Sequence, residues 1–320
     1  MGKGINCLTT VVFFCFLFSC SEKNSAVDIQ SLLGSHRITV ADLQTLMANQ
    51  TEILMIDVRT SEEFLKGKIP GAQNVWRNEM NEITADTNEY SSITAPKEKI
   101  EQLLGRMGAK TNVPIVIYDN KVNADAANLW WILWRFGKRD VMLLEGGLQA
   151  WREAGGELSQ KNEPFPPSDF HFTSPEDNSR NASLKTVVDA LSDPGTIILD
   201  VRSYEEYSGT RKAESAIKSG RVPGSIWMNY SDLIEEKGQC TYYKPEEEIQ
   251  NILASKGVDS RKKIICYCQS GVRSAHTTFV LSEIMGYKNV MNFDGSWEEW
   301  SSHDELAVEM GESNSARNNP

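Results

Sequence analysis

The chain lacks an excess of basic residues. It carries 33 lysines and arginines against 44 aspartates and glutamates, which gives a formal net charge of -11 over 320 residues. Proteins that bind nucleic acid need a basic surface to neutralise phosphates, so nucleic acid is excluded as a partner. The remaining composition, 40% hydrophobic and 24% charged, is that of a soluble globular protein. The length allows two domains, each with a core of its own.

Long hydrophobic runs are also missing. The run from Leu8 to Phe18 follows Lys3 at the N-terminus; it is too short to span a membrane and has the shape of a secretory signal. It ends in Leu-Phe-Ser-Cys, which resembles a bacterial lipobox, whose cysteine, here Cys20, is lipidated. We expect a lipoprotein signal at residues 1–20, a tether at 21–34, and export to the periplasmic side with a lipid anchor in the membrane. An ordinary cleaved signal and an uncleaved anchor are the alternatives.

Cysteines are too few for a disulfide framework. Of the six, Cys7 and Cys15 lie in the signal and Cys20 would carry lipid. Cys266 and Cys268 point the same way along an extended segment, but a bridge between such close neighbours is strained. Cys266 is therefore interpreted as a core residue of a strand. Cys240 has no evident role, and an occasional bridge to another thiol stays open in an oxidising compartment.

The segment from Ile264 to Met285 predicts a strand, a short polar loop and a helix, with Cys268 at the turn. With Ser274 as the helix cap, the loop amides would curl around the Cys268 sulfur, and the positive end of the helix dipole would favour its thiolate. Arg273 would add a fixed positive charge. The residues expected to bind substrate here are Gln269, Ser270, Gly271, Val272, Arg273 and Ser274. The alternative is a buried structural cysteine.

The loop sequence Cys-Gln-Ser-Gly-Val-Arg-Ser, between its strand and its helix, resembles the active-site loop of the rhodanese-type sulfurtransferases. That resemblance implies that the Cys268 thiolate takes the outer sulfur of a donor such as thiosulfate and keeps it as a persulfide. A small acceptor, cyanide or a thiol, then removes the sulfur. The resemblance implies no cofactor and no metal.

An internal repeat sets the architecture. Residues 53–64 recur at 197–207, each with Asp-Val-Arg at the end of an apolar strand, and further matches pair Pro96 with Pro245. Strands alternate with amphipathic helices in both copies, which predicts two tandem rhodanese-like domains, each a mostly parallel α/β sheet with helices on both faces. We expect domain 1 at residues 35–155, a linker at 156–180, domain 2 at 181–305 and a disordered tail at 306–320.

The two copies differ at the decisive position. The spacing that aligns Pro96 with Pro245 aligns Asp119 with Cys268. An aspartate cannot carry sulfur, so domain 1 is expected to be non-catalytic and to serve as a wall of the cleft that faces Cys268.

Other chemistries remain as alternatives. A phosphatase loop on this fold is Cys-x5-Arg, whereas Arg273 makes Cys-x4-Arg here. Mercaptopyruvate sulfurtransferases share the two-domain plan, but they carry a hydroxyl residue where Arg273 stands and an arginine where Glu206 stands, so thiosulfate is favoured as the donor. A sulfur carrier that serves a partner protein is the third alternative.

Several further residues have a structural interpretation. Asp57 and Asp200, with Arg59 and Arg202, are expected to fix loops by hydrogen bonds, although Arg202 is also a candidate substrate-binding residue. His276 is expected to pack or cap a helix. Two groups of tryptophans are expected to fill cores, the second with the alternative of closing the cleft: Trp130, Trp131 and Trp134, then Trp297 and Trp300.

Overall fold

The computed structural model describes residues 1–2, 29–83, 90–120, 122–161 and 165–312. The expected signal, Cys20 and most of the expected tether lie outside the described residues, as do residues 313–320. Within the described part, no helix is long and apolar enough to cross a membrane.

Domain 1 is built on one parallel sheet of five strands in the order β1-β7-β6-β2-β3. The strands are β1 (Arg37–Ile38), β2 (Leu54–Asp57), β3 (Gln73–Asn74), β6 (Ile115–Tyr118) and β7 (Val141–Leu144). The helices are α1 (Ile29–Ser35), α2 (Val40–Ala48), α3 (Ser61–Lys66), α4 (Lys97–Arg106), α5 (Ala124–Arg135) and α6 (Gly147–Glu153). A 3₁₀ turn at Arg77–Met80 leads into the antiparallel pair β4 (Asn81–Ile83) and β5 (Tyr90–Thr94).

Domain 2 repeats this plan, with a parallel sheet in the equivalent order β8-β14-β13-β9-β10. The strands are β8 (Asn181–Ala182), β9 (Thr196–Asp200), β10 (Ile226–Trp227), β13 (Lys263–Tyr267) and β14 (Val290–Phe293). The helices are α7 (Leu184–Ala190), α8 (Tyr204–Ser208), α9 (Glu246–Ser255), α10 (Val272–Phe279) and α11 (Ser296–Ser302). The hairpin β11 (Ile234–Lys237) and β12 (Cys240–Tyr243) follows a 3₁₀ turn at Tyr230–Leu233, and a second such turn, Asn178–Arg180, precedes β8. The predicted tandem α/β fold is confirmed.

Helices cover both faces of each sheet because successive strand residues point to opposite sides. In β2, Leu54 and Ile56 face the side covered by α4 and α5, whereas Met55 faces the side of α2 and α6. In β13, Ile264 and Cys266 face α9 and α10, whereas Ile265 faces α7 and α11. Cys266 is fully buried, and burial raises the pKa of its thiol to about 12, in agreement with its interpretation as a core residue.

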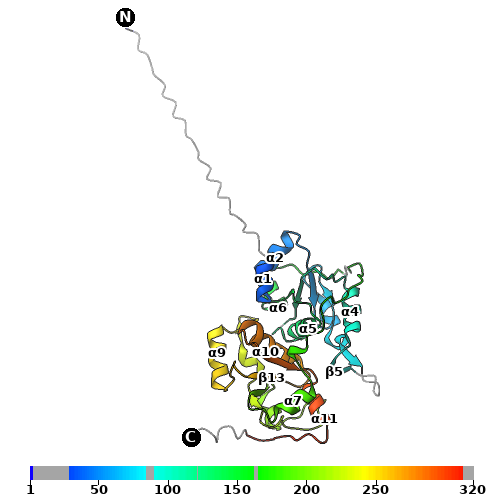
Figure 1. Cartoon of the computed structure of the whole chain (residues 1–320). Coiled ribbons are helices and arrows are strands. Elements are labelled where there is room, and N and C mark those ends of the chain that lie inside the picture. Colours follow the sequence, from blue (N-terminus) through cyan, green and yellow to red (C-terminus); the bar gives the residue numbers. More distant parts are fainter. Residues whose placement is uncertain (3–28, 84–89, 121, 162–164, 313–320) are drawn as a thin grey trace.

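The two domains share a core along α5 and α10, which pack against each other in the middle of the molecule (Figure 1). The rings of Trp130 and Phe279 meet edge to face at 4.9 Å between centroids. α10 continues as one π-helical turn, Val280–Ile284, in the same buried cluster. Trp130 therefore fills the boundary between the domains as well as the first core, and Trp131 is buried in the same cluster. Trp297 and Trp300 lie in the core on the other side of the second sheet.

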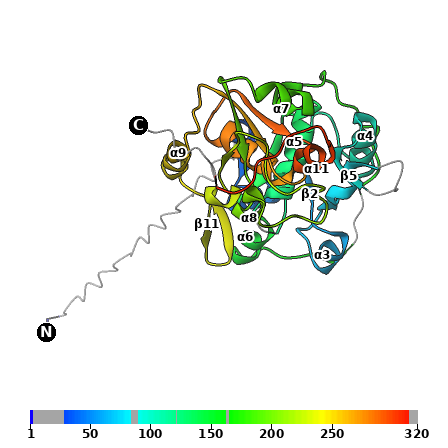
Figure 2. The same ribbon diagram turned by 90° about the horizontal axis from the view of Figure 1, so that it is seen from below.

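A second contact between domains joins β5 to the segment that precedes α11, elements that Figure 2 shows side by side. The backbone N–H and the hydroxyl of Thr94 donate hydrogen bonds of 3.0 and 3.1 Å to the carboxylate of Asp294. Burial raises the pKa of Asp294 to about 6. Domain 1 is thus fixed to the end of β14, next to the loop that carries Cys268.

Two expected boundaries differ from the structure, and the expected linker packs on domain 1. Residues 29–34, assigned to the tether, belong to α1, because Leu32 and Leu33 pack on domain 1. Residues 306–312, assigned to a disordered tail, run along domain 2, where Leu306 and Val308 pack on its core. In the linker, Phe170 and Phe172 are buried against domain 1. In each case apolar side chains order a segment whose composition is mainly polar.

Candidate functional site

Cys268 is the first residue after β13, at the carboxyl ends of the parallel strands, and its residue surface is 1% exposed. The hydroxyl oxygen of Ser296 accepts hydrogen bonds from the N–H groups of Cys268 and Gly271, at 3.1 and 3.0 Å. The same hydroxyl donates to the carbonyl of Phe293 at 2.7 Å. One side chain at the start of α11 therefore fixes both ends of the Cys268 turn.

The helix after Cys268 begins earlier than predicted. Gly271, with φ of 79°, is the N-cap residue and Val272 is the first helical residue, so Ser274 is not the cap. A left-handed φ favours glycine, and a Cβ at this position would lie 2.5 Å from the carbonyl oxygen of Asp294. Glycine is required here, and a serine cap is not.

The expected amide cradle requires N–H donors near Cys268 that are not used elsewhere. Among the described residues, no hydrogen bond uses the N–H groups of Gln269, Ser270, Val272, Arg273 or Ser274. The N–H of Gly271, expected to face the sulfur, is instead bonded to Ser296. The Ser274 hydroxyl donates toward Sγ of Cys268 at 3.5 Å. A helix start with open donors is a site for an anion, and here it follows a thiol by four residues.

Arg273 forms an ion pair with Glu206. The sequence predicted the positive charge of Arg273 but not this partner. Its Nη1 and Nη2 donate to the two carboxylate oxygens of Glu206 at 2.9 and 3.0 Å. Burial alone would raise the pKa of Glu206, but the hydrogen bonds and charge of Arg273 lower it to about 2. Glu206 is held in place by the capping box of α8, where it accepts a bond from the N–H of Ser203. The Ser-x-x-Glu pattern was the sequence signal for the position of this carboxylate.

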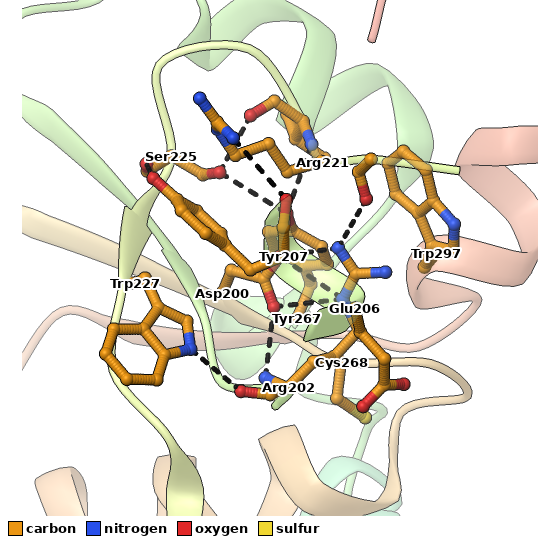
Figure 3. Close-up of polar contacts among 12 residues, drawn as sticks. Asp200, Arg202, Glu206, Tyr207, Arg221, Ser225, Trp227, Tyr267, Cys268 and Trp297 are labelled. Atoms are coloured by element: carbon orange, nitrogen blue, oxygen red, sulfur yellow. Dashed lines mark hydrogen bonds and ion pairs between the residues drawn. The ribbon is translucent and has the colours of Figure 1, made fainter. Parts of the chain in front are cut away.

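Arg202 lies behind the site and does not line the cleft, so its candidate role in substrate binding is not supported. Its residue surface is 1% exposed, its Nε and Nη2 bind the Asp200 carboxylate, and Nη2 also donates to the carbonyl of Gly220. Figure 3 shows this pair beside Cys268, with the indole N–H of Trp227 donating to the Arg202 carbonyl. Arg59 and Asp57 repeat the arrangement in domain 1. The interpretation of these pairs as loop supports agrees with the structure.

The cleft is a cavity of about 470 Å³ between the two domains. From domain 2 it is lined by Tyr230, Cys268, Gln269, Ser270, Val272 and Arg273. From domain 1 the lining residues include Arg59, Glu63, Trp76, Arg77, Asp119 and Asp125. Gly271 and Ser274 shape the turn without facing the cavity. Asp119 stands opposite Cys268 as the equivalent residue of the first domain.

His276 packs beneath the site. It is fully buried on α10, and its ring lies 5.7 Å from that of Tyr230 and 5.4 Å from that of Tyr243. Neither ring nitrogen has a hydrogen-bond partner within the described part of the chain, and burial lowers the pKa of the imidazole to about 4. A neutral ring in contact with two tyrosine rings agrees with the packing interpretation. No cluster of three or more histidine, cysteine or acidic side chains that suits a metal ion occurs among the described residues.

A thiol at a helix start that faces a cysteine-free copy of its own domain, in a two-domain α/β protein, is an arrangement suited to covalent transfer at one cysteine. The chain belongs to the rhodanese family and is a sulfurtransferase: the Rhodanese-like domain matches residues 39–154 and 183–303.

Full-length relatives agree with this family. A thiosulfate sulfurtransferase of Corynebacterium glutamicum is 30% identical over 255 residues, which cover 77% of this chain and 81% of that protein. The sulfur carrier protein TtuD of Thermus thermophilus is 29% identical over 256 residues, 77% of this chain and 86% of the relative. A solved structure, the anaerobic ergothioneine biosynthesis enzyme from Chlorobium limicola, superposes with a TM-score of 0.78 at 22% identity, covering 87% of this chain and 71% of that one. The last comparison shows a shared fold.

Proposed function

We propose that the chain is a thiosulfate sulfurtransferase that carries sulfur as a persulfide on Cys268. The observation that supports this most directly is a buried thiol that lines the cleft just before a helix whose first N–H groups have no hydrogen-bond partner among the described residues. The Cys268 thiolate attacks the outer sulfur of thiosulfate, the sulfur–sulfur bond of the donor breaks, and sulfite leaves with the electron pair. The acceptor then attacks the outer sulfur of the persulfide, and the Cys268 thiolate leaves with its electrons.

The Cys268 loop stabilises two anionic groups in this reaction: the persulfide anion on Cys268 and the sulfonate end of thiosulfate. The amides of Gln269, Ser270 and Val272 suit the outer sulfur of a persulfide anion, as preorganised donors. Arg273 has five N–H donors, of which Glu206 accepts two. The remaining N–H groups of the guanidinium are available to the sulfonate end of thiosulfate. Arg273 can therefore orient thiosulfate while the carboxylate of Glu206 balances the charge of the arginine.

The test is a steady-state assay of the mature chain with cyanide as acceptor and thiosulfate and mercaptopyruvate as rival donors. We expect preference for thiosulfate and complete loss of activity in Cys268→Ser. The variant Cys266→Ser is the matched control, since this neighbouring thiol is buried away from the cleft. Turnover that survives Cys268→Ser contradicts the proposal. A preference for mercaptopyruvate would identify mercaptopyruvate as the sulfur donor in place of thiosulfate.

A second candidate function is that of a sulfur carrier that delivers sulfur to a partner protein. It is favoured by the similarity to the carrier protein TtuD. A carrier would gain one sulfur atom on Cys268, hold it for many minutes and turn over poorly with cyanide. Mass spectrometry of the thiosulfate-treated protein during the same assay separates the two functions.

We also propose that the protein is exported and anchored to the membrane through Cys20. The support is the short apolar run that ends in Leu-Phe-Ser-Cys. Mass spectrometry of the N-terminal peptide from the native host should show a lipid on Cys20, and Cys20→Ala should leave the protein unlipidated. An unmodified peptide that begins after a different cleavage site would overturn the anchor.

A further inference from the structure

The strand β14, next to the strand that carries Cys268, has a polar side chain in the core. Asn292 is fully buried, and its amide reaches the N-cap residue of α10. Its cross-strand partner on β13 is Cys266. At the equivalent register of domain 1, the partners are Ile117 and Leu143, and both are buried. The domain that carries the thiol therefore has asparagine where the other domain has leucine.

The amide of Asn292 is only partly satisfied. Nδ2 donates to the carbonyl oxygen of Gly271 at 3.2 Å, and because a carbonyl only accepts, this contact identifies the nitrogen of the amide. Oδ1 is buried and has no hydrogen-bond partner within the part of the chain that the structure describes. An apolar side chain would avoid the cost of an unpaired buried oxygen. The hydrogen bond to Gly271 is the contact that distinguishes this asparagine from the leucine of domain 1.

That hydrogen bond acts on a peptide group of the Cys268 loop. The Gly271 carbonyl also accepts from the Ser274 hydroxyl at 3.1 Å and from the N–H of Ala275 at 2.9 Å. The C=O and N–H of a trans peptide point in opposite directions, so these donors also fix the direction of the Val272 N–H. Donors on a carbonyl polarise its peptide group, which makes the N–H of that peptide a stronger donor.

The Val272 N–H belongs to the first turn of α10, beside the sulfur. Ser274, in the same turn, donates its hydroxyl toward Sγ of Cys268 at 3.5 Å. Val272 and Cys268 also line the same cleft. No described residue accepts a hydrogen bond from the Val272 N–H. This donor is therefore available to an anion at Cys268.

The two preceding peptide groups of the loop are held in a similar way. The carbonyls of Cys268 and Gln269 accept hydrogen bonds of 3.0 Å from backbone N–H groups in the first turn of α11. The N–H groups of these two peptides have no partner among the residues that the structure describes. Three peptide groups of the loop are thus anchored through their oxygens, and the side chain of Asn292 contributes to the third.

We propose that Asn292 is a positioning residue for sulfur transfer: it orients and polarises the Gly271–Val272 peptide, whose N–H stabilises the anion at Cys268. This inference rests on the proposed persulfide chemistry and adds a residue that acts on it from the core. The thiolate sulfur of Cys268 bonds to the outer sulfur of thiosulfate, and sulfite leaves with the electron pair of the broken sulfur–sulfur bond. The negative charge of the thiolate moves to the terminal sulfur of the persulfide. A donor that is already oriented stabilises this charge without reorganisation.

The test measures activity and stability in Asn292→Leu, which removes the amide together with its unpaired oxygen. Persulfide formation is followed in single turnover by quenching and mass spectrometry. At saturating thiosulfate its rate should fall by about fivefold to fiftyfold, less than the loss of a whole oxyanion donor. The half-saturating thiosulfate concentration should stay within about twofold, because Arg273 is unchanged. The urea midpoint of unfolding should not fall, whereas a merely structural asparagine would lower rate and stability together.

A second variant and a control complete the test. Leucine is larger than asparagine, so Asn292→Ala, which cannot overpack the core, should show the same loss of rate. Met291→Leu is the matched control, since Met291 lies on the same strand and packs on the opposite face of the sheet. Wild-type rates in both Asn292 variants overturn the inference, as does a loss of rate that appears only with a lower urea midpoint.

Failure of the proposed function is distinguishable from failure of this inference. If thiosulfate does not load Cys268 in the wild type, the proposed function fails. The role of Asn292 is then decided by the rate at which iodoacetamide alkylates Cys268, mapped by mass spectrometry. Slower alkylation in both Asn292 variants supports the positioning role, and unchanged alkylation overturns it.

Discussion

Glu206 holds Arg273 through two parallel hydrogen bonds, and this ion pair links α8 to the first turn of α10. Glu206 is 5% exposed, so the pair is largely shielded from water. Removal of one partner from such a pair leaves the other charge without compensation and costs more stability than removal of both.

The first prediction concerns this pair. Glu206→Gln leaves the Arg273 charge unbalanced beside Cys268, so KM for thiosulfate should fall by about threefold to tenfold while the free energy of unfolding drops by about 1–3 kcal/mol. Arg273→Gln should raise KM and destabilise the protein more, because Glu206 then stays buried and charged with only the 3.3 Å contact to the exposed Arg211 as compensation. The double variant should recover part of the stability, measured by urea unfolding. Additive losses would show that the two side chains do not act as a pair.

The second prediction concerns Ser296. Its hydroxyl holds the N–H groups of Cys268 and Gly271, so Ser296→Ala should lower kcat by about tenfold to a hundredfold and stability by about 1–3 kcal/mol. Ser296 also has φ of 51°, a conformation that glycine adopts without strain. Ser296→Gly should therefore lose as much activity as the alanine variant but less stability. Activity retained in both variants would show that the hydroxyl is dispensable.

The third prediction compares two glycines with similar φ angles. A Cβ at Gly271 meets the Asp294 carbonyl, whereas a Cβ at Gly224, with φ of 72°, meets nothing within 4 Å. Gly224→Ala should cost about 1–2 kcal/mol from the left-handed conformation alone. Gly271→Ala should cost more and abolish persulfide formation, because the backbone at the Cys268 turn must move. Thermal unfolding and mass spectrometry after thiosulfate treatment measure both effects, and equal outcomes for the two variants would exclude the steric argument.

The fourth prediction concerns Asp294, whose pKa burial raises to about 6. A carboxyl with a raised folded-state pKa binds its proton more tightly in the folded protein, so it stabilises the fold at low pH, and this contribution is lost as pH rises from about 4 to about 6. Two pKa units correspond to at most about 3 kcal/mol. Asp294→Asn should remove this slope from the profile of stability against pH. An unchanged slope in the variant would assign the titration to another group.

The fifth prediction concerns His276, whose effect on the pH dependence of stability is opposite to that of Asp294. Because burial lowers its pKa to about 4, the unfolded chain binds the proton more readily, and stability is lost as pH falls from about 6.5 to about 4. His276→Phe should remove this acid sensitivity, keep the ring contacts with Tyr230 and Tyr243, and leave kcat within about twofold. Loss of turnover in a folded His276→Phe protein would contradict the packing role.

The sequence predicted the features that depend on local patterns. Apolar runs and their repetition predicted both sheets, and the residues from Ile264 to Met285 predicted the strand, loop and helix around Cys268. The aligned pair of Asp119 and Cys268 predicted which thiol faces the cleft.

Features that depend on residues far apart in the chain were not predicted. Ser296 contacts a loop that begins 28 positions earlier, and Glu206 meets Arg273 across 67 positions. The Trp130 helix gave an apolar pattern that fits a core, but nothing in it showed that the core extends into the second domain. Side-chain partners of this kind are fixed by the packing of whole elements, which local periodicity does not specify.

The packing of α5 on α10 has one more consequence. Because Trp130 and Phe279 belong to one continuous apolar cluster, neither half of the chain can rotate away from the other without exposing large rings to water. The catalytic cleft is therefore rigid at its base, and substrates must enter and leave past surface side chains. The half of the protein without a thiol is a permanent part of the enzyme's scaffold, and we expect both halves to unfold in a single cooperative transition.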